Sequence, residues 1–216
     1  MIKILIKGAS GKMGRRILFC ASQDKEFKVV EAIDQADVLI DFSHPDATIL
    51  HLELAAKAKK RAVIGTTGHT EEQKKQIESF AKKLPFVLSP NMSVGVNVMW
   101  KIIGEAARKL GSEFKVNVTE IHHIYKKDKP SGTALQIARV LAETMKISPE
   151  KIPIEAIRQG EVVGIHKTVF ESSGEFLEIL HNAKSRDTFA LGALRAARWI
   201  VGKPNGLYSM ANVLSL

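Results

Sequence analysis

The sequence predicts an α/β protein with two domains, and three observations carry that prediction. Up to about residue 92, short apolar runs alternate with helical patterns, which is typical of a parallel sheet covered on both faces. A glycine-rich turn follows the first apolar run and leads directly into a helix. Beyond residue 110 strand patterns dominate, which indicates a second, α+β domain with antiparallel pairing. We expect the domains to comprise 1–93 with 186–216, and 94–185.

The composition is that of a globular protein. The chain has 216 residues, with a hydrophobic fraction of 45% and a charged fraction of 25%, and can bury a substantial core. No apolar run approaches the roughly 20 residues needed to cross a membrane. The apolar run at the N-terminus is too short for a signal peptide, so we expect a cytoplasmic protein with no membrane partner. The single cysteine, Cys20, excludes an internal disulfide and a cysteine metal cluster.

The formal net charge of +9 calls for an anionic partner. The lysines are spread along helices, without an aromatic-basic cluster or a recognition helix, so we expect no nucleic acid. A polyanionic small substrate and a phosphorylated cofactor would also benefit from a positive field.

The first strand, predicted over 2–6, leads into Gly8-Ala9-Ser10-Gly11-Lys12-Met13-Gly14 and a helix over 15–21. This order of strand, glycine turn and helix is where a Rossmann domain binds a dinucleotide pyrophosphate. The pattern is GxxGxxG, with Ser10 in place of the second glycine of GxGxxG, and glycines at such a turn also occur for packing alone. A second strand is predicted over 29–33. It ends at Asp34, about 20 residues beyond the last glycine, where a Rossmann domain places the acid for the adenosine ribose.

Further strands are predicted over 38–42, 62–64 and 86–88, with helices beginning at 43–46 and at a capping box in 70–73. Polar or glycine turns, 65–68 and 89–92, follow the last two strands. Ligands bind beyond the carboxyl ends of parallel strands. The predicted cofactor cleft therefore comprises Gly8, Ala9, Ser10, Gly11, Lys12, Met13, Asp34, Gly65, Thr66, Thr67, Ser89, Pro90, Asn91 and Met92.

The second half of the chain begins with a helix predicted over 93–110, which Gly111 closes. Strands are predicted over 115–124, 154–159, 162–171 and 175–181, with a helix over 134–146 between the first two. A last helix over 188–201 returns to the first domain and ends at Gly202.

The stretch 120–134 concentrates the chemistry. A strand delivers His122, His123 and Lys126, and Ser131-Gly132-Thr133 forms the N-terminus of a helix, which is a good seat for a carboxylate. His122 and Lys126 can supply protons and His123 can hold a polar substrate group, although Lys126 could alternatively form a Schiff base. Two histidines with no fixed carboxylate partner fall short of three or four metal ligands, so we predict no metal.

The string from His122 to Ala134, His-His-x-x-Lys-x-Asp-x-Pro-Ser-Gly-Thr-Ala, resembles the signature of the dihydrodipicolinate reductase (4-hydroxy-tetrahydrodipicolinate reductase) family of bacterial lysine and diaminopimelate synthesis. The similarity extends over the whole chain. Residues 8–14 resemble the family's phosphate loop, 65–68 and 91–96 its cofactor and hinge segments, and 185–190 its return to the first domain.

The resemblance implies an oxidoreductase that uses NADH and/or NADPH to reduce a small dianionic substrate. This substrate is the dehydrated form of 4-hydroxy-tetrahydrodipicolinate, and the product is tetrahydrodipicolinate. The resemblance also implies that His122 and Lys126 donate protons, that His123 contacts the substrate, and that the helix N-terminus at 131–133 binds a substrate carboxylate. Finally, it implies a homotetramer formed through the sheet of the second domain.

Two departures from the family concern the cofactor. The segment between Asp34 and Asp37 is far shorter than in longer members, and Gln35 stands where those members often have an arginine able to hold a 2′-phosphate. The preference between NADH and NADPH therefore stays open. Two other classes remain as alternatives: a Rossmann reductase of another amino or imino acid, such as an aspartate dehydrogenase-like protein, and a non-catalytic dinucleotide sensor.

Overall fold

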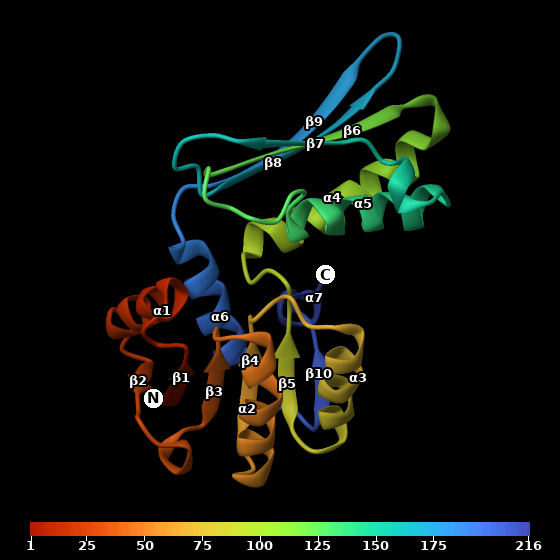
Figure 1. Cartoon of the computed structure of the whole chain (residues 1–216). Helices are drawn as coiled ribbons and strands as arrows, with labels where there is room; N and C mark the ends of the chain where they lie inside the picture. The colour runs from red at the N-terminus through yellow and green to blue at the C-terminus, as the bar shows by residue number, and fades with distance from the viewer. The chain divides into compact units, whose positions relative to one another are not determined.

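The computed structural model describes residues 1–216 and divides into two compact units, Met1–Val94 with Arg186–Leu216, and Gly95–Ser185 (Figure 1). The first unit contains both chain termini, and the second is inserted between its two segments. The roles expected for the two units remain predictions.

A six-stranded, fully parallel sheet forms the centre of the first unit, in the order β10-β5-β4-β3-β1-β2. The predicted parallel α/β fold is therefore confirmed. The strands are β1 (Ile2–Lys7), β2 (Phe27–Val29), β3 (Val38–Asp41), β4 (Arg61–Ile64), β5 (Pro85–Leu88) and β10 (Gly206–Tyr208). The sequence pattern missed β10, because three residues are too few to show an alternation of apolar and polar side chains.

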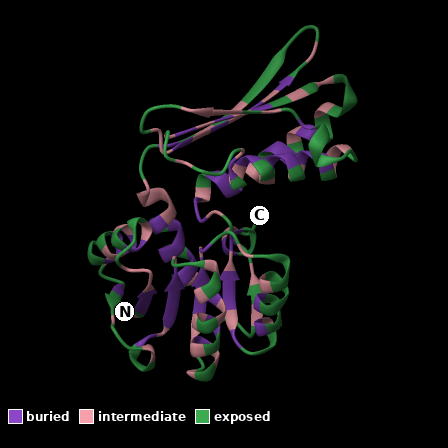
Figure 2. Ribbon diagram, in the orientation of Figure 1, coloured by how far each residue is buried: buried purple, intermediate pink, exposed green.

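Helices cover both faces of this sheet (Figure 1). One face packs against α1 (Lys12–Ser22), α6 (Asp187–Ile200) and α7 (Met210–Leu214), and the other against α2 (Pro45–Lys57) and α3 (Glu71–Ser79). Successive residues of β1 alternate between the two cores, with Ile4 and Ile6 in the first and Leu5 in the second. Figure 2 shows the inner strands β1, β3, β4 and β5 as mostly buried.

The second strand differs from its prediction. β2 ends at Val29 instead of continuing to residue 33, and Ile33–Gln35 forms a short 3₁₀ turn, η1. The physical reason is topological, because β2 and β3 lie on opposite sides of β1. The chain must leave β2 early so that the short connection can cross β1 and reach the start of β3. This order, β2-β1-β3, places the switch in strand order between β1 and β3.

The second unit is a four-stranded sheet in the order β7-β6-β8-β9. Its strands are β6 (Lys115–His122), β7 (Ile154–Arg158), β8 (Gly164–Glu171) and β9 (Phe176–Ala183). The pairs β6–β8 and β8–β9 are antiparallel as predicted, but β6 and β7 are parallel, because α5 (Gly132–Met145) and the 3₁₀ turn η4 (Pro149–Lys151) lie between them and carry the chain back. β6 ends at His122, so the predicted extension to residue 124 is wrong.

Helices α4 (Val94–Leu110) and α5 pack on one face of this sheet, and the 3₁₀ turn η3 (Gly111–Glu113) follows α4. Val118 and Phe170 project from the sheet into the core between them, together with Ile137 and Leu141 of α5. The remaining 3₁₀ turn, η2 (Phe80–Lys82), extends α3 in the first unit.

Candidate functional site

The turn after β1 is compact, and its contacts explain the spacing of its glycines. Gly8 has a φ of +80°, and a Cβ atom there would lie 2.3 Å from the carbonyl oxygen of Phe42. A Cβ atom on Gly14 would lie 2.1 Å from the carbonyl oxygen of Gly8. Both positions therefore require glycine, which brings strand, turn and helix as close together as a pyrophosphate-binding turn needs.

The N-terminus of α1 is suited to bind an anion. Its N-cap residue, Gly11, has no side chain to satisfy the first N–H groups, and the first turn contains no acidic residue. Ser10, Gly11 and Lys12 are all exposed. Free N–H groups at the positive end of a helix dipole attract phosphate. These residues therefore fit the pyrophosphate of a dinucleotide.

The loops after β3 and β4 are joined through Asp41, the buried last residue of β3. Its carboxylate accepts hydrogen bonds from the Ser43 hydroxyl at 2.5 Å and the Thr48 hydroxyl at 3.0 Å. Thr66 connects the two loops, because its hydroxyl donates to the Asp41 carbonyl oxygen at 3.3 Å and accepts from the Ser43 N–H at 3.0 Å. This network holds 65–67 at the same edge of the sheet as the glycine turn.

The turn after β5 adds the last predicted segment to this edge. The Ser89 hydroxyl donates to the Asn91 carbonyl oxygen at 2.8 Å, which fixes the turn. Pro90 is exposed and Asn91 is half-buried, whereas Met92 is 1% exposed and belongs to the core. The Met92 side chain is therefore structural.

Asp34 does not lie at this edge. It belongs to η1, and its carbonyl oxygen accepts a hydrogen bond at 3.0 Å from the side chain of Lys60, the residue directly before β4. Asp34 is therefore at the amino edge of the parallel sheet, opposite the glycine turn. The carboxylate that follows β2 on its carboxyl side is that of Glu31, which is exposed. Sequence reasoning missed Glu31 because it placed this residue inside the strand.

In the second unit, β6 ends with a buried acid–base pair. Glu120 is 0% exposed and His122 is 7% exposed. Both face the helix side of the sheet, and a Glu120 oxygen contacts Nδ1 of His122. The sequence expectation that the histidines have no carboxylate partner is therefore wrong. The two-residue spacing on one strand was the available signal, because side chains at i and i+2 share a face.

The other oxygen of Glu120 binds two further groups. It accepts hydrogen bonds from the Arg158 guanidinium at 2.9 Å and from the backbone N–H of Ser131 at 3.2 Å. Burial lowers the pKa of His122, and the nearby charges of Lys126 and Arg158 act in the same direction, while Glu120 opposes them.

His166 of β8 lies beside this pair, directly across from Glu120 in the sheet. Its ring centroid is 5.0 Å from that of His122, and its Nε2 lies 3.2 Å from the Ser131 hydroxyl oxygen. Burial, with the charges of His122, His181 and Lys126, lowers the pKa of His166 to about 3. His166 is therefore neutral near pH 7, and its Nε2 can accept the Ser131 hydroxyl proton.

The N-terminus of α5 lies next to these side chains. Ser131 is its N-cap, and the Ser131 hydroxyl accepts a hydrogen bond from the Ala134 N–H at 3.2 Å. The first turn contains no acidic residue. Gly132 is exposed, and a Cβ atom there would meet nothing within 4 Å. There is therefore room for an anion over this helix end.

Lys126 lies in the loop between β6 and α5. Its backbone N–H donates to the His123 carbonyl oxygen at 3.1 Å, and its ammonium lies 2.9 Å from an Asp128 carboxylate oxygen. Burial raises the pKa of Asp128, but Lys126 and the Gly132 N–H outweigh it, so the pKa is lowered overall. His123 is half-buried just beyond β6, with its ring centroid 6.3 Å from that of Tyr125.

Glu120, His122 and His166 place possible metal-ligand atoms within 4.8 Å of one another. Two histidines and one carboxylate are the ligand set of some zinc enzymes. Here, however, the carboxylate already binds a guanidinium, a backbone N–H and an imidazole nitrogen. The residues form a hydrogen-bonded ion-pair network, and the sequence-based prediction of no metal is retained as a prediction.

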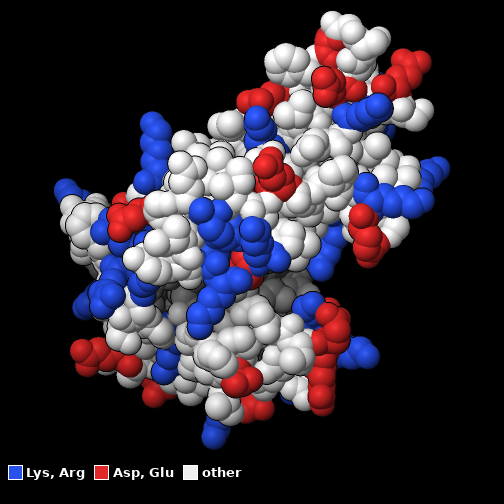
Figure 3. Space-filling view, turned by 45° about the horizontal axis from the view of Figure 1, so that its top comes forward, with Lys and Arg blue, Asp and Glu red and all other residues white.

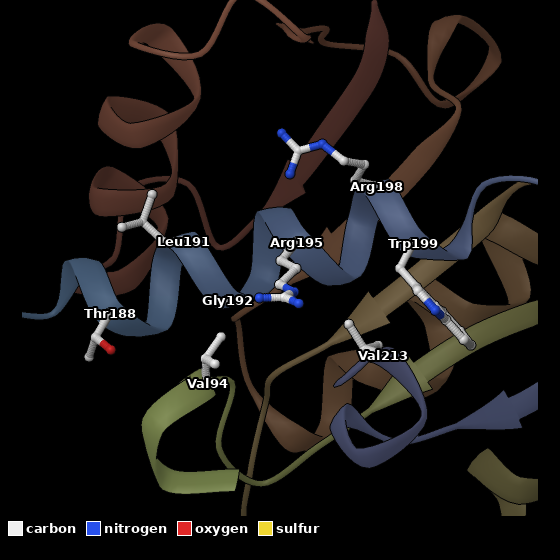
Figure 4. A pocket seen from close by; sticks show the side chains of 8 residues that line it. All are labelled: Val94, Thr188, Leu191, Gly192, Arg195, Arg198, Trp199 and Val213. Carbon is white, nitrogen blue, oxygen red and sulfur yellow. The ribbon is translucent and has the colours of Figure 1, made fainter. Parts of the chain in front are cut away.

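A separate cavity of about 660 Å³ lies along α6 in the first unit, lined in part by Arg195, Trp199 and Val213. Figure 4 shows Arg195 extending from α6 toward the side where Val94 and Val213 lie. None of the predicted cofactor or substrate residues lines this cavity. It therefore does not mark the predicted chemistry.

Lysine and arginine side chains are spread over the face seen in Figure 3, with acidic side chains among them. None of the helices is both long enough and apolar enough to span a membrane.

Comparison with known proteins decides the family. The family model described as "Dihydrodipicolinate reductase, N-terminus" matches residues 2–36 and 31–92, and "Dihydrodipicolinate reductase, C-terminus" matches 95–214. The chain belongs to the dihydrodipicolinate reductase family. The N-terminal match consists of two ranges that overlap at 31–36, beside the segment between Asp34 and Asp37 that is shorter than in longer members of the family.

Curated members of the dihydrodipicolinate reductase family match over their full length. The 4-hydroxy-tetrahydrodipicolinate reductase of Aquifex aeolicus is 40% identical over 263 residues, covering 100% of this chain and 99% of the relative. That of Syntrophus aciditrophicus is 36% identical over 264 residues, covering 99% and 98%. The alignments are longer than this chain of 216 residues, so these relatives contain stretches that it lacks.

The fold of the dihydrodipicolinate reductases is also found among solved structures. A dipicolinate-bound dihydrodipicolinate reductase from Paenisporosarcina sp. TG-14 has a TM-score of 0.81 at 24% identity, covering 97% of each chain. Aspartate dehydrogenase from Thermotoga maritima, a member of one alternative class, has a TM-score of 0.54 at 14% identity. Family membership and these dehydrogenase neighbours imply a nicotinamide dinucleotide cofactor and a small-molecule substrate.

Proposed function

We propose that this chain catalyses the reduction of 4-hydroxy-tetrahydrodipicolinate, through its dehydrated form, to tetrahydrodipicolinate in lysine and diaminopimelate biosynthesis. The observation that carries the proposal is the family match over essentially the whole chain. The chain is thus an oxidoreductase, and NADH or NADPH supplies the hydride.

The first unit is proposed as the cofactor domain. The open N-terminus of α1 and the two tightly packed glycines, Gly8 and Gly14, support pyrophosphate binding at the first turn. The loops at 65–67 and 89–92 contribute polar groups at the same edge of the sheet, mainly through their backbones. The Met92 side chain has no direct part, since it is buried in the core.

For the adenosine ribose we propose Glu31 in place of Asp34. Glu31 follows the carboxyl end of β2, the strand end at which Rossmann domains hold the ribose, whereas Asp34 lies at the amino edge of the sheet. A carboxylate at this place binds the ribose hydroxyls and repels a 2′-phosphate. Ala32 follows it, so the position directly after this acid has no arginine to hold that phosphate. We therefore propose a preference for NADH over NADPH.

The second unit is proposed as the substrate domain. His122 and Lys126 are the proposed proton donors, and His123 is a proposed substrate contact. The N-terminus of α5 at 131–133 is the proposed seat of a substrate carboxylate, supported by the open space over Gly132. We propose that no metal takes part.

We further propose a cytoplasmic homotetramer. The face of the second unit's sheet opposite α4 and α5 carries exposed apolar side chains, among them Phe176 at 68% and Leu180 at 54%. An uncovered apolar sheet face favours burial against other copies of the chain. Leu180→Lys should therefore reduce the mass measured by light scattering, whereas Leu50→Lys, at an exposed leucine of α2, should not.

The reaction can be tested directly with a coupled assay. A synthase acting on pyruvate and aspartate semialdehyde supplies fresh substrate, and loss of NADH or NADPH absorbance reports turnover. Oxidation that depends on the synthase would establish the reaction, and the two cofactor curves would give the preference. Cofactor binding without any oxidation would refute the proposal.

A further inference from the structure

The Glu120 carboxylate contacts three groups of the second unit: the His122 imidazole, the Arg158 guanidinium and the Ser131 backbone N–H. It is 0% exposed, so its charge must be compensated within the protein. One oxygen contacts Nδ1 of His122. The other accepts hydrogen bonds from Arg158 at 2.9 Å and from the Ser131 N–H at 3.2 Å. Both oxygens therefore bind groups of the proposed active site or their direct supports.

Arg158 extends this set of contacts to the loop that carries Lys126. Its Nη1 donates to Glu120, and its Nη2 donates to the Asp128 carbonyl oxygen at 2.5 Å. The Asp128 carboxylate in turn lies 2.9 Å from the Lys126 ammonium. The position of the loop is thus linked to the buried carboxylate.

We propose that Glu120 is the positioning residue of this active site. It orients the His122 imidazole through Nδ1, so that Nε2 carries the proton to the substrate, and it fixes the start of α5 through the Ser131 N–H. The identity of the reaction in this inference rests on the proposed function. The role of Glu120 rests on its contacts in the structure.

The choice of Nε2 follows from the geometry. An imidazole whose Nδ1–H binds a carboxylate must release its second proton from Nε2, and the carboxylate stabilises the protonated ring. In the reaction, the imidazolium loses the Nε2 proton to the substrate and becomes neutral, while the hydride comes from the nicotinamide. Gly164 leaves space at this nitrogen, since a Cβ atom there would lie only 3.0 Å from Nε2.

Glu120 also raises the pKa of His122, against the effects of burial and nearby positive charge. The groups around the imidazole are Glu120 on its own strand, Arg158 on β7, His166 on β8 and Lys126 in the following loop. Burial, Lys126 and Arg158 lower the pKa of His122, and only Glu120 raises it. Removing the carboxylate charge should therefore lower the pKa of His122, so that its imidazolium loses the donated proton at a lower pH.

The test compares Glu120→Gln with Glu143→Gln, which alters an exposed carboxylate of α5 that is outside this set of contacts. In Glu120→Gln we expect kcat to fall on the order of a hundredfold, at the low end of what general acid catalysis contributes. The falling limb of the pH profile should move to lower pH, while the KM for NADH stays unchanged. Glu143→Gln should match the wild type in all three measurements. Unchanged kcat and pH profile in Glu120→Gln would overturn the inference.

A second measurement does not require turnover. Nitrogen NMR of histidine-labelled wild-type protein distinguishes the two neutral tautomers of His122, whose signal is assigned by its absence in His122→Gln. We expect Nδ1 to keep its proton after Nε2 has lost its own. An Nε2–H tautomer would overturn the inference. If the wild type binds NADH but does not reduce the substrate, the proposed function fails, whereas the tautomer still decides the role of Glu120.

Discussion

His166 offers the most direct test of the buried network, because its neutrality must affect stability. It is 4% exposed, and burial with neighbouring positive charge lowers its pKa from 6.5 to about 3. The unfolded chain binds a proton below about pH 6.5, whereas the folded chain does not until about pH 3. The folded state therefore loses stability as the pH falls from 6.5 toward 3. Between pH 8 and pH 5 this loss should be about 2 kcal/mol.

Urea unfolding measures this loss. The two tryptophans lie in different units, Trp100 in α4 and Trp199 in α6. In a Trp199→Phe background, fluorescence therefore reports the second unit alone. A loss of about 2 kcal/mol corresponds to a midpoint about 1 M lower in urea, for an m-value near 2 kcal/mol/M.

The matched variant is His166→Gln, which keeps a group able to accept the Ser131 hydroxyl proton but does not titrate. From pH 8 to pH 5, the urea midpoint of the parent should decrease by about 1 M more than that of His166→Gln. This difference does not depend on the stability of the variant at pH 8. The half-buried His181, whose pKa burial also lowers, is present in both proteins. An identical pH dependence in the two proteins would refute the reasoning.

Three further predictions concern the cofactor and the chemistry. Lys126→Ala should reduce kcat by a factor of about 10²–10⁴, as expected for the loss of a proton donor, while NADH binding, measured by fluorescence, is retained. Near-wild-type turnover would refute this role. Gly14→Ala should abolish NADH binding, because its Cβ atom would lie 2.1 Å from a backbone oxygen. The control is Gly174→Ala, where nothing lies within 4 Å of the added Cβ atom. Unimpaired NADH binding in Gly14→Ala would contradict the packing argument. Glu31→Ala should raise the Kd for NADH more than that for NADPH, because it removes the ribose carboxylate, whereas Asp34→Ala at the amino edge should change neither. Equal effects of Glu31→Ala on the two cofactors, measured by titration, would argue against a ribose contact.

Much of the first unit could be predicted from local pattern. The alternation of apolar runs and helices gave the parallel sheet, because each strand needs cover on both faces and each crossover needs a helix. The glycine turn was visible as well, since its sharp geometry and close contacts require glycine at fixed positions. The same local reasoning failed for β2. Its end depends on where β3 lies in the sheet, which no local pattern records.

Some residues of the proposed active site could likewise be predicted from the sequence, and others could not. By itself the sequence determined that His122, Lys126 and the start of α5 occur within one short stretch, because chain connectivity alone keeps them together. Only the tertiary structure decided that Glu120 and His166 belong with them, since strand register aligned β8 with β6 and brought Arg158 in from β7. The tertiary structure also showed that Asp34 lies at the amino edge of the first sheet. Cross-strand pairing is set by packing between distant segments, so a single sequence cannot reveal which side chains it will bring into contact.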